Sequence, residues 1–382
     1  MFSTKGQPNI IVIGAGVQGL SVACLLQSRG HKVTIVSHSS PSNPSPNTPT
    51  HHFTSPKAGA NWFSFAEKDD IRLQEWDALT LQTLKTLSPV PNLGIHKLPC
   101  NQYWKNTEDY EKPWYADIDH LKYEKLPTSS LPPSYKKGIK FDTLTINVPV
   151  YLSNLSQLFL SLGGTFLPVP TSPPLTHITQ TFTITTPPPT LIINCTGLGS
   201  RTLGGVEDKD VYPTRGQTVL VKAAVERTVV DFGGRFGGDE VTYVIPRGDG
   251  TVILGGTYQP NDWNLTPDPE TAMRIITRCT AICPEIVPPG QTSPHILTHD
   301  VGLRPSRKGG LRLEVEKFDN GSGELVPVVH NYGHGGYGYQ SSWGCAAEVA
   351  LLAEGQLKGG ADGGNINLED RQGILLEFER ML

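Results

Sequence analysis

The 382-residue sequence predicts an α/β protein, in which a parallel sheet with helical crossovers is joined to a second domain built on an antiparallel sheet. Three observations support this prediction. A strand–helix–strand pattern opens the chain, a later apolar strand ends in a second glycine-rich turn, and β-hairpin patterns lie between these pieces.

The opening strand is the apolar run 10–13, which does not alternate with polar residues and is therefore typical of a strand buried on both faces. A G-x-G-x-x-G motif follows at Gly14, Gly16 and Gly19. Such glycines allow a tight turn, close approach of the backbone to a pyrophosphate, and packing of the next helix on the strand. In this context the motif predicts a dinucleotide site rather than a plain glycine-rich turn.

The helix that follows is expected to end at Gly30, and residues 32–36 supply the second strand. Dinucleotide sites usually carry an acidic residue after this strand to hold the ribose, but this chain has Ser37 and His38 there. No arginine replaces the carboxylate. The motif alone therefore does not choose between FAD and NAD, and other parts of the chain must contribute to binding.

Composition excludes several functional classes. The formal net charge is −4 and no basic stretch is present, so nucleic acid is not expected as a partner. No apolar run is long enough to predict a membrane span. The first strand begins within the first ten residues, so we expect no signal peptide.

The six cysteines lack the C-x-x-C spacing of metal sites, and no metal is expected. Cys279 and Cys283 are four residues apart on one face of a predicted helix. Cβ atoms at that spacing are about 5–6 Å apart, too far for a relaxed disulfide. We therefore expect buried thiols in an intracellular protein.

The next part of the chain alternates between loops and helices. Residues 41–50 are predicted to form an exposed loop, and the small residues of 55–62 form a loop whose backbone N–H groups could reach a flat ring. Residues 70–86 have a helical pattern. Residues 89–135, rich in proline and aromatic residues, are expected to be irregular and to belong to the second domain.

Residues 148–162 predict a helix with Leu152, Leu155, Leu158 and Leu162 on its buried side. A strand at 165–169 and a loosely alternating segment at 177–185 follow. The short apolar strand 191–194 then runs into the glycine turn 195–199. Ligands of doubly wound sheets bind at such carboxyl ends of strands.

A strand is expected at 215–221, and residues 241–256 predict a hairpin around Gly248-Asp249-Gly250. A helix is predicted over 267–286, with Thr266 as its N-cap. Hairpins between the nucleotide-binding pieces imply an inserted substrate domain. The predicted nucleotide domain comprises residues 1–62, 140–205 and 290–382, and the substrate domain comprises 63–139 and 206–289.

The glycine-rich segment 330–340 leads into a predicted helix from about 341 to 353. Glycines at the start of a helix allow its free N–H groups to face a ligand, and the helix dipole favours negative charge there. Reduced flavin carries negative charge around N1 and the C2 carbonyl, so an oxidase would benefit from such a helix.

The assembled motifs resemble those of the D-amino acid oxidase family of the fungal type. The similarity extends over nearly the whole sequence, in the order VIGAGVQGLS, SPKAGANW, NCTGLGSRTLGG, RGQTVLVK, TYVIPRGDGTVILGGTY, VGLRPSR and HNYGHGGYGYQSSWG. The resemblance implies a Rossmann-like FAD-binding domain, a mixed α+β substrate domain on an antiparallel sheet, and non-covalent FAD.

The resemblance also assigns roles to matching positions. Arg304 would bind the substrate carboxylate, Tyr243 and Tyr258 would surround the carboxylate and amine, and Gln340 would face the substrate. The implied cofactor-binding residues are Gly14, Ala15, Gly16, Val17, Gly19, Ser37, Gly59, Ala60, Asn61, Trp62, Val169, Thr196, Gly197, Arg304, Gly335, Gly336, Tyr337, Gly338, Tyr339 and Gln340. A planar guanidinium suits the first role because it donates two parallel hydrogen bonds to a carboxylate.

The implied reaction is oxidation of a D-amino acid, preferably neutral, by hydride transfer from Cα to N5 of FAD, with O2 as electron acceptor. The products would be a 2-oxo acid, ammonia and hydrogen peroxide. D-aspartate oxidase is the nearest alternative; that family carries arginine where Tyr258 stands here. A glycine- or sarcosine-type amine oxidase is more distant, and a nucleotide-binding regulator without turnover is the alternative from another class.

Family members are commonly peroxisomal, but the chain ends Glu379-Arg380-Met381-Leu382 without the usual small–basic–leucine signal. The expected location is therefore the peroxisome or the cytoplasm. A homodimer is possible. The preferred side chain of the substrate is left open.

Overall fold

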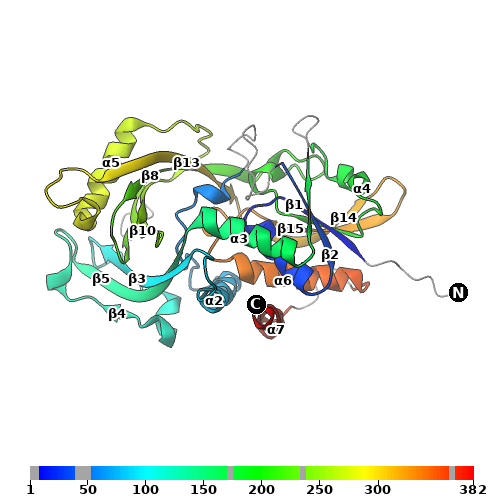
Figure 1. The fold of residues 1–382 in the computed structure, drawn as a ribbon, viewed down its shortest axis with the longest axis horizontal. Coiled ribbons are helices and arrows are strands. Elements are labelled where there is room, and N and C mark those ends of the chain that lie inside the picture. The colour runs from blue at the N-terminus through cyan, green and yellow to red at the C-terminus, as the bar shows by residue number, and fades with distance from the viewer. Residues whose placement is uncertain (1–7, 39–52, 170–174, 233–237, 361–365) are drawn as a thin grey trace.

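A computed structural model of the chain describes residues 8–38, 53–169, 175–232, 238–360 and 366–382. Two β-sheets lie toward opposite ends of the long axis (Figure 1). The predicted loop 41–50 lies outside the described residues.

The first sheet has six strands in the order β14-β15-β7-β1-β2-β6. The pairs from β15 to β6 are parallel, and β14 pairs antiparallel with β15. This arrangement confirms the predicted parallel sheet. Its strands are β1 (Asn9–Ile13), β2 (Lys32–Ser37), β6 (Thr165–Pro168), β7 (Leu191–Asn194), β14 (Arg312–Asp319) and β15 (Leu325–Tyr332).

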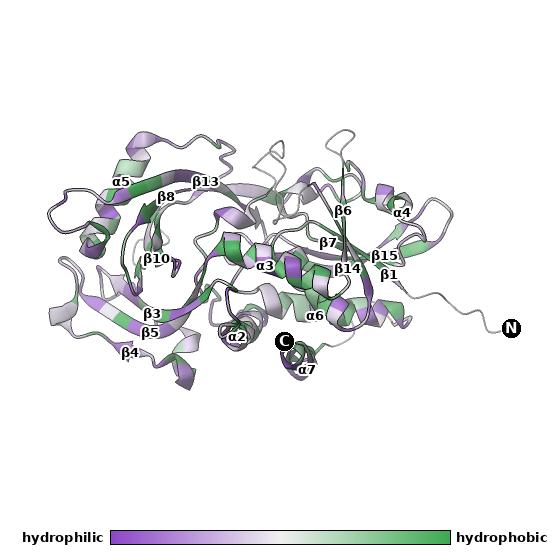
Figure 2. Ribbon diagram, viewed as in Figure 1, coloured by the Kyte–Doolittle hydropathy of each residue, from purple (hydrophilic) through white to green (hydrophobic). Residues whose placement is uncertain are grey.

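Both faces of β1 are buried, as its continuous apolar sequence predicts. Ile10 and Val12 pack into the core under the helices, whereas Ile11 and Ile13 pack into a second core on the other face. Figure 2 shows the corresponding hydrophobic colour on β1 and β7. The strand therefore places its carboxyl end, and the glycine turn after it, in the centre of the molecule.

The turn after β1 depends on the absence of side chains at two positions. Gly14 has φ +106°, and a Cβ there would lie 2.6 Å from the carbonyl oxygen of Cys195. A Cβ at Gly19 would lie 2.0 Å from the carbonyl oxygen of Gly14. The two glycines thus permit the turn and the close packing of the following helix on it.

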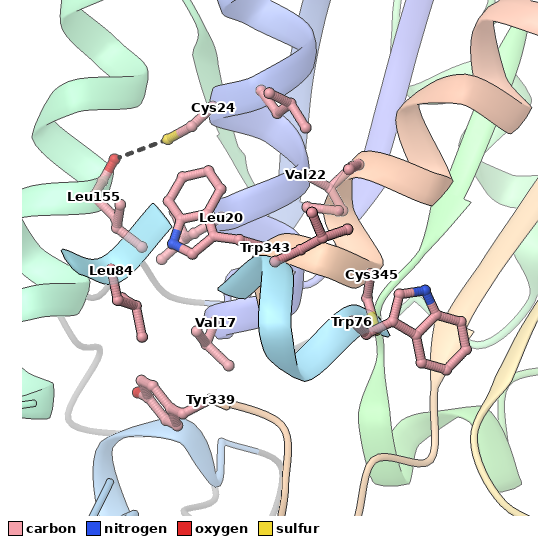
Figure 3. Close-up of a cluster of buried hydrophobic side chains, with 14 of the residues drawn as sticks. Val17, Leu20, Val22, Cys24, Trp76, Leu84, Leu155, Tyr339, Trp343 and Cys345 are labelled. Carbon is pink, nitrogen blue, oxygen red and sulfur yellow. Dashed lines mark hydrogen bonds between the residues drawn. The ribbon is translucent and has the colours of Figure 1, made fainter. Parts of the chain in front are cut away.

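Helices cover the face of the sheet to which Ile10 and Val12 point. Those packed on its strands are α1 (Val17–Ser28), α3 (Val148–Ser161) and α6 (Ser342–Leu357), whereas α2 (Ile71–Leu87) and α7 (Leu368–Met381) pack against α6. Within this core Trp343 donates its indole N–H to the Tyr151 hydroxyl at 2.9 Å. The Cys24 thiol contacts the Leu155 carbonyl at 3.4 Å, as Figure 3 shows.

The predicted helices are largely confirmed, with two differences. α3 buries Leu152 and Leu155 as predicted, but Leu158 and the C-cap Leu162 are only partly buried, and Phe159 is in the core instead. The α7 helix was not predicted; Asn367 caps it by accepting a hydrogen bond from the Asp370 backbone N–H.

The opposite face of the sheet is covered by residues 177–185. Residues 177–185 alternate loosely in sequence but form helical turns, η6 (Ile178–Gln180) and α4 (Thr181–Ile184). His177 caps these turns by accepting from the backbone of Thr179. Ile178 and Phe182 then face Ile11 and Ile13, so the apolar residues reach the core from turns rather than from a strand.

The second sheet has nine strands in the order β12-β8-β11-β10-β9-β3-β5-β4, with β13 also paired to β8. The predicted hairpin is confirmed by the antiparallel pair β10 and β11. The strands are β3 (Ile95–Trp104), β4 (Glu124–Lys125), β5 (Lys137–Ile146), β8 (Val211–Lys222), β9 (Thr228–Asp231), β10 (Glu240–Pro246), β11 (Thr251–Thr257), β12 (Gln259–Pro260) and β13 (His295–Arg307).

The expectation that residues 89–135 are irregular is wrong for their first part. β3 pairs with β5 over ten residues and also with β9, in spite of Pro99. Tertiary pairing outweighs the weak local signal here. The remainder consists of short turns, η3 (Trp114–Asp117), η4 (Asp119–Leu121) and η5 (Thr128–Ser130), around the two-residue strand β4.

The helix α5 (Pro269–Ile282) covers one face of the nine-stranded sheet. Its predicted start is wrong by two residues: Asp268, not Thr266, is the N-cap, and its carboxylate accepts from the Thr271 backbone N–H at 2.7 Å. The sequence Thr-Pro-Asp-Pro offers two equivalent cap-and-proline signals, and the stronger acceptor takes the position.

The division of the chain into two domains stays a prediction, and strand pairing departs from the predicted boundaries in two places. Residues 140–146 belong to β5 and residues 295–307 form β13, so both lie in the nine-stranded sheet. The predicted nucleotide domain includes both of these ranges. β13 then leads straight back toward β14 and β15 of the other sheet.

All six cysteines are buried and free, as expected from their spacing. Cys283 is the C-cap of α5 rather than a member of its last turn. None of the helices in the described residues combines the length and apolarity that crossing a membrane requires.

Candidate active site

A cavity of about 1120 Å³ lies between the two sheets. It is lined by the turn after β1, by the turn after β7, and by the segment that precedes α6. On the other side it is lined by strands of the nine-stranded sheet. The volume exceeds that of most small-ligand pockets and suits a large, extended cofactor together with a substrate.

The cavity brings together most of the predicted site residues from segments far apart in the sequence. Those that line it are Gly14, Ala15, Gly16, Val17, Ser37, Gly59, Ala60, Asn61, Thr196, Gly197, Tyr243, Tyr258, Arg304, Gly335, Gly336, Tyr337, Gly338, Tyr339 and Gln340.

Three predicted residues do not line the cavity. Gly19 acts through packing against Gly14, as described above. Trp62 is 1% exposed and donates its indole N–H to the backbone carbonyl of Asp77 at 2.9 Å, so its ring lies in the core. Val169 packs against the second core, and only its backbone N–H reaches Ser37, at 2.9 Å.

The loop that contains Gly59, Ala60 and Asn61 is held from both sides. It begins with the turn η2 (Ser55–Lys57), where Thr54 donates its hydroxyl to the Leu303 carbonyl at 2.6 Å and Lys57 forms an ion pair with Asp300. It ends as an extension of β5, because the Ile146 N–H donates to the Ala60 carbonyl at 2.8 Å. The loop is therefore fixed before any ligand binds.

Ala60 has φ +52°, in the left-handed region that non-glycine residues rarely adopt. Such a conformation costs about 1–2 kcal/mol for an L-residue, so the surrounding contacts must enforce it. Asn61, the next residue, has a buried side-chain N–H group without a hydrogen-bond partner among the described residues. Both features lie on the cavity wall.

The segment before α6 closes another side of the cavity. Tyr339 donates its hydroxyl to the Ser55 carbonyl at 2.9 Å, and burial raises the pKa of this hydroxyl well above its usual value. Gln340 is 3% exposed and donates its side-chain N–H to the Asp77 carboxyl at 2.9 Å. The first turn of α6 contains no acidic residue, as a site for negative charge near a helix N-terminus requires.

The first turn of α1 meets the cavity at Gly16 and Val17. It also lacks acidic residues, and the Val17 N–H donates to the Ser55 hydroxyl at 3.1 Å. A helix N-terminus with a free positive end and no carboxylate suits a pyrophosphate.

The far end of the cavity is lined by Ser37, His38, Thr176, Thr202 and Leu203. No carboxylate stands at the end of β2, as the sequence showed, and His38 has a buried ring nitrogen without a partner in the described structure. Hydroxyl groups and an imidazole therefore occupy the place where an acidic residue usually holds the ribose.

The cavity fits FAD because three of its buried side-chain nitrogens have no hydrogen-bond partner within the described residues. His38, Asn61 and His334 line it, and each has a buried side-chain nitrogen with no hydrogen-bond partner in the described part of the chain. Burial lowers the pKa of His334 to about 3, so this imidazole is neutral at ordinary pH. Buried polar groups normally have partners, and a bound cofactor would supply them.

Arg304 projects from β13 into the cavity, where its guanidinium lies 5.4 Å from the centre of the Tyr258 ring. One guanidinium N–H donates to the Thr257 carbonyl at 3.1 Å. No ion pair joins Arg304 to a carboxylate within the described ranges. The other cavity-lining cations differ, since Lys57 pairs with Asp300 and Arg307 pairs with Asp208.

Tyr243 lies on β10, opposite Gly255 of β11, and its side chain is directed to the cavity. Burial raises the pKa of its hydroxyl, and the neighbouring Arg304 guanidinium opposes this shift. The hydroxyl is therefore a neutral donor close to the guanidinium. Tyr258 is 41% exposed and lies on the outer side of the group formed with Tyr243 and Arg304.

Four phenylalanines of the cavity wall were not identified from the sequence: Phe53, Phe63, Phe65 and Phe232. The ring of Phe63 lies 4.9 Å from that of Phe65 and 5.9 Å from that of Phe232. The alternation of Phe63 and Phe65 after Asn61 was an available signal. Phe232 carried no local signal, because only the pairing of β9 with β10 brings it near Tyr243.

Comparison with known proteins agrees with this geometry. Residues 9–352 match the family described as FAD dependent oxidoreductase. A D-amino-acid oxidase of Schizosaccharomyces pombe is 36% identical, with 92% of this chain and 97% of that protein covered. A D-amino-acid oxidase of Fusarium vanettenii is 35% identical (90% and 96%), and a D-aspartate oxidase of Cryptococcus neoformans var. grubii is 34% identical (90% and 96%).

Among solved structures, glycine oxidase from Bacillus cereus is similar with a TM-score of 0.66 and 18% identity, covering 91% of this chain and 95% of that one. At this identity the match supports the fold alone. Since the family match covers the cavity and both sheets, the chain belongs to the FAD dependent oxidoreductase family.

Proposed function

We propose that the protein catalyses the oxidative deamination of D-amino acids, preferably neutral ones, to 2-oxo acids, ammonia and hydrogen peroxide. The observation that carries this proposal is the Arg304 guanidinium, which lies in the cavity between Tyr243 and Tyr258 without a carboxylate partner among the described residues. The names of the relatives support it, since both D-amino-acid oxidases and a D-aspartate oxidase are among them.

The side chains would act by binding and orienting the substrate. Arg304 would hold the carboxylate through two parallel hydrogen bonds, and the neutral Tyr243 hydroxyl would add a donor without adding charge. FAD, when bound, supplies the acceptor for the hydride from Cα and transfers the electrons to O2. Fixing the carboxylate fixes the direction of the Cα–H bond, so positioning can support the step without a protein base.

The cavity wall favours a neutral, apolar side chain. Val230 of β9 lies directly opposite Tyr243, so its side chain is directed to the same face of the sheet, and Phe232, which follows β9, also lines the cavity. Phe63 adds a third apolar group at 5.9 Å from Phe232. Binding an apolar side chain there removes apolar surface from water at no electrostatic cost.

D-Aspartate is the second candidate substrate, because a D-aspartate oxidase is among the relatives at 34% identity. A second carboxylate requires a second cation, and Tyr258 does not provide one. The two other cavity-lining cations on described residues, Lys57 and Arg307, are already paired with carboxylates. A glycine- or sarcosine-type oxidase is supported only by similarity of fold.

The test is a panel of amino acids with peroxide as the readout. The protein loaded with FAD is incubated with D-alanine, D-phenylalanine, D-aspartate, glycine and the corresponding L-enantiomers. Peroxide from neutral D-amino acids, with little from D-aspartate and none from L-enantiomers, is the expected result. Absence of peroxide with every D-amino acid, in protein that carries FAD, would favour a regulator without turnover.

Location in the peroxisome or cytoplasm and assembly as a homodimer are proposals as well. Imaging of the full chain in cells tests the first, and light scattering of the purified protein tests the second.

A further inference from the structure

Asp77, in the middle of α2, is a fully buried carboxyl group at 0% exposure. Its Oδ2 accepts from the Ser64 hydroxyl at 2.6 Å and from the Gln340 side-chain N–H at 2.9 Å. Its Oδ1 is buried and has no hydrogen-bond partner among the residues that the structure describes. None of the roles proposed above for the site residues uses this group.

No cation balances Asp77 within the described structure. The titratable groups around it are Asp70 on its own helix, and Tyr337 and Cys345 beside Gln340. None of these is positively charged. An ionised carboxylate without a cation is costly to bury, so such a group retains its proton. Burial raises the pKa of Asp77 well above its usual range, although the hydrogen bonds from Ser64 and Gln340 oppose the shift.

The hydrogen bonds around Asp77 have a defined direction. The Ser64 hydroxyl oxygen accepts from the Trp114 indole N–H at 2.9 Å and from the Ala66 backbone N–H at 3.1 Å. Its own hydrogen is therefore free for Asp77 Oδ2. The amide nitrogen of Gln340 donates to Asp77 Oδ2 at 2.9 Å, so the amide oxygen faces away from Asp77.

We propose that Asp77 is a positioning residue of the FAD site, which as an uncharged carboxylic acid fixes the orientation of the Gln340 side-chain amide on the cavity wall. Gln340 touches the cavity, whereas Asp77 does not line it. The proposal rests on the FAD site and is independent of the substrate.

An uncharged acid at this place has a specific advantage. Reduction of a flavin adds negative charge to its ring system, and a carboxylate behind Gln340 would oppose that charge in a poorly solvated region. A neutral acid supplies the same acceptor without the repulsion. The serine–aspartic acid–glutamine chain thus provides orientation without charge.

The experiment compares Asp77→Asn and Asp77→Leu with Thr83→Val as the matched control. Thr83 lies on the same helix, is 0% exposed and makes no side-chain hydrogen bond with the described residues. FAD affinity is measured by titrating the apoprotein, and the visible spectrum and midpoint potential are measured on the loaded protein. None of these readouts uses a substrate.

Asn keeps an acceptor oxygen and remains neutral, so the FAD dissociation constant should change by less than about threefold and the potential should not move. Leu removes the acceptor from a buried donor, which should weaken FAD binding by about tenfold and alter the visible spectrum. In a Gln340→Leu background, Asp77→Leu should add little, because both changes remove the same interaction. Thr83→Val should leave the affinity unchanged.

Two results would overturn the proposal. A clear rise in midpoint potential on Asp77→Asn would mean that a negative charge had been removed, so the native group would be ionised. An Asp77→Leu protein with the affinity and spectrum of Thr83→Val would mean that Asp77 does not act on the flavin. If the Leu variant fails to fold, the potential of the Asn variant still decides the charge state.

Discussion

The two ends of the cavity recognise their ligands by different means. At the six-stranded sheet the wall is made of backbone, because Gly14, Gly16 and Gly197 bring main-chain groups to the surface of the cavity. At the nine-stranded sheet the wall is made of side chains, with Arg304 on β13, Tyr243 on β10 and Phe232 directly after β9. Adding side-chain atoms should impair ligand binding at the first end, and removing side-chain atoms should impair it at the second.

This difference explains why the two ends depend on sequence differently. A backbone site requires only that side chains be absent, and a short glycine motif encodes it locally. A side-chain site requires that several groups meet from distant strands, so it depends on the register of the whole sheet. Arg304 reaches Tyr258 only because β13 pairs with β8, which in turn pairs with β11.

The largest effect is expected at the side-chain end, on replacing Arg304 with Leu. Removing one partner of a buried charged pair costs about 2–5 kcal/mol. At about 1.4 kcal/mol per decade, kcat/KM for D-alanine should fall roughly 30-fold to several thousand-fold. Arg304→Lys should recover only part of this, because an ammonium keeps the charge but loses the planar fork.

The readout is steady-state kinetics after the flavin content of each variant has been measured. The Leu variant should retain FAD, since the backbone end of the cavity is untouched. Near-normal kinetics in that variant would mean that the substrate carboxylate is bound elsewhere.

A smaller effect is expected at the backbone end, on replacing Gly14 with Ala. The new Cβ would lie 2.6 Å from the Cys195 carbonyl, and φ is +106° there. Strain of about 1–3 kcal/mol should weaken FAD binding roughly 5- to 140-fold. Gly30→Ala is the control, because Gly30 also has positive φ, +82°, but a Cβ there meets nothing within 4 Å. If both variants bind FAD equally, the turn at Gly14 is not part of the site.

Replacing Tyr258 with Arg should shift substrate specificity from D-alanine toward D-aspartate rather than abolish activity. An added cation beside the cavity attracts a second carboxylate, and at a site 41% exposed we expect about 1 kcal/mol, or roughly a fivefold gain for D-aspartate relative to D-alanine. Tyr258→Phe separates the charge from the loss of the hydroxyl. An unchanged ratio of kcat/KM values would show that Tyr258 does not face the substrate side chain.

The smallest effect concerns the ion pairs that hold the C-terminal end of α1 to α6, outside the cavity lining. Burial opposes ionisation of Glu354, but hydrogen bonds from His31 and Arg29 outweigh it and lower its pKa from 4.5 to about 2. Because the folded pKa is depressed, this stabilisation is present above pH 4.5 and is lost as the pH falls toward 2.

Glu354→Gln should therefore reduce the free energy of unfolding by about 1 kcal/mol at pH 6, a value lowered for partial solvent screening, and by less at pH 3. Urea unfolding at the two pH values measures this. An equal loss at both values would assign the effect to packing rather than to charge.

Local signals in the sequence predicted the backbone end well. The strand 10–13, the glycine motif and the helix C-terminus at Gly30 depend on neighbouring residues, and the structure places all three as predicted. The hairpin at 241–256 is confirmed for the same reason, because the turn residues fix it.

The parts that were missed depend on long-range pairing. β3 contains a proline and little alternation, and it becomes a strand through β5 and β9. Trp62 follows Asn61 in a motif assigned to the flavin, yet its indole N–H is used by Asp77 in the core. Asp77 itself has no sequence signal, because a carboxyl in an amphipathic helix is normally exposed.

Anaerobic reduction of the flavin tests whether Arg304 presents a D-amino acid to FAD. D-Alanine or L-alanine is added to the FAD-bound protein without oxygen, and the visible flavin absorption is followed. The band should be lost with D-alanine and retained with L-alanine, and the Arg304→Leu protein should respond far more slowly to D-alanine. Retention of the band with every D-amino acid, or equal loss with both enantiomers, would mean that the protein does not selectively oxidise D-amino acids.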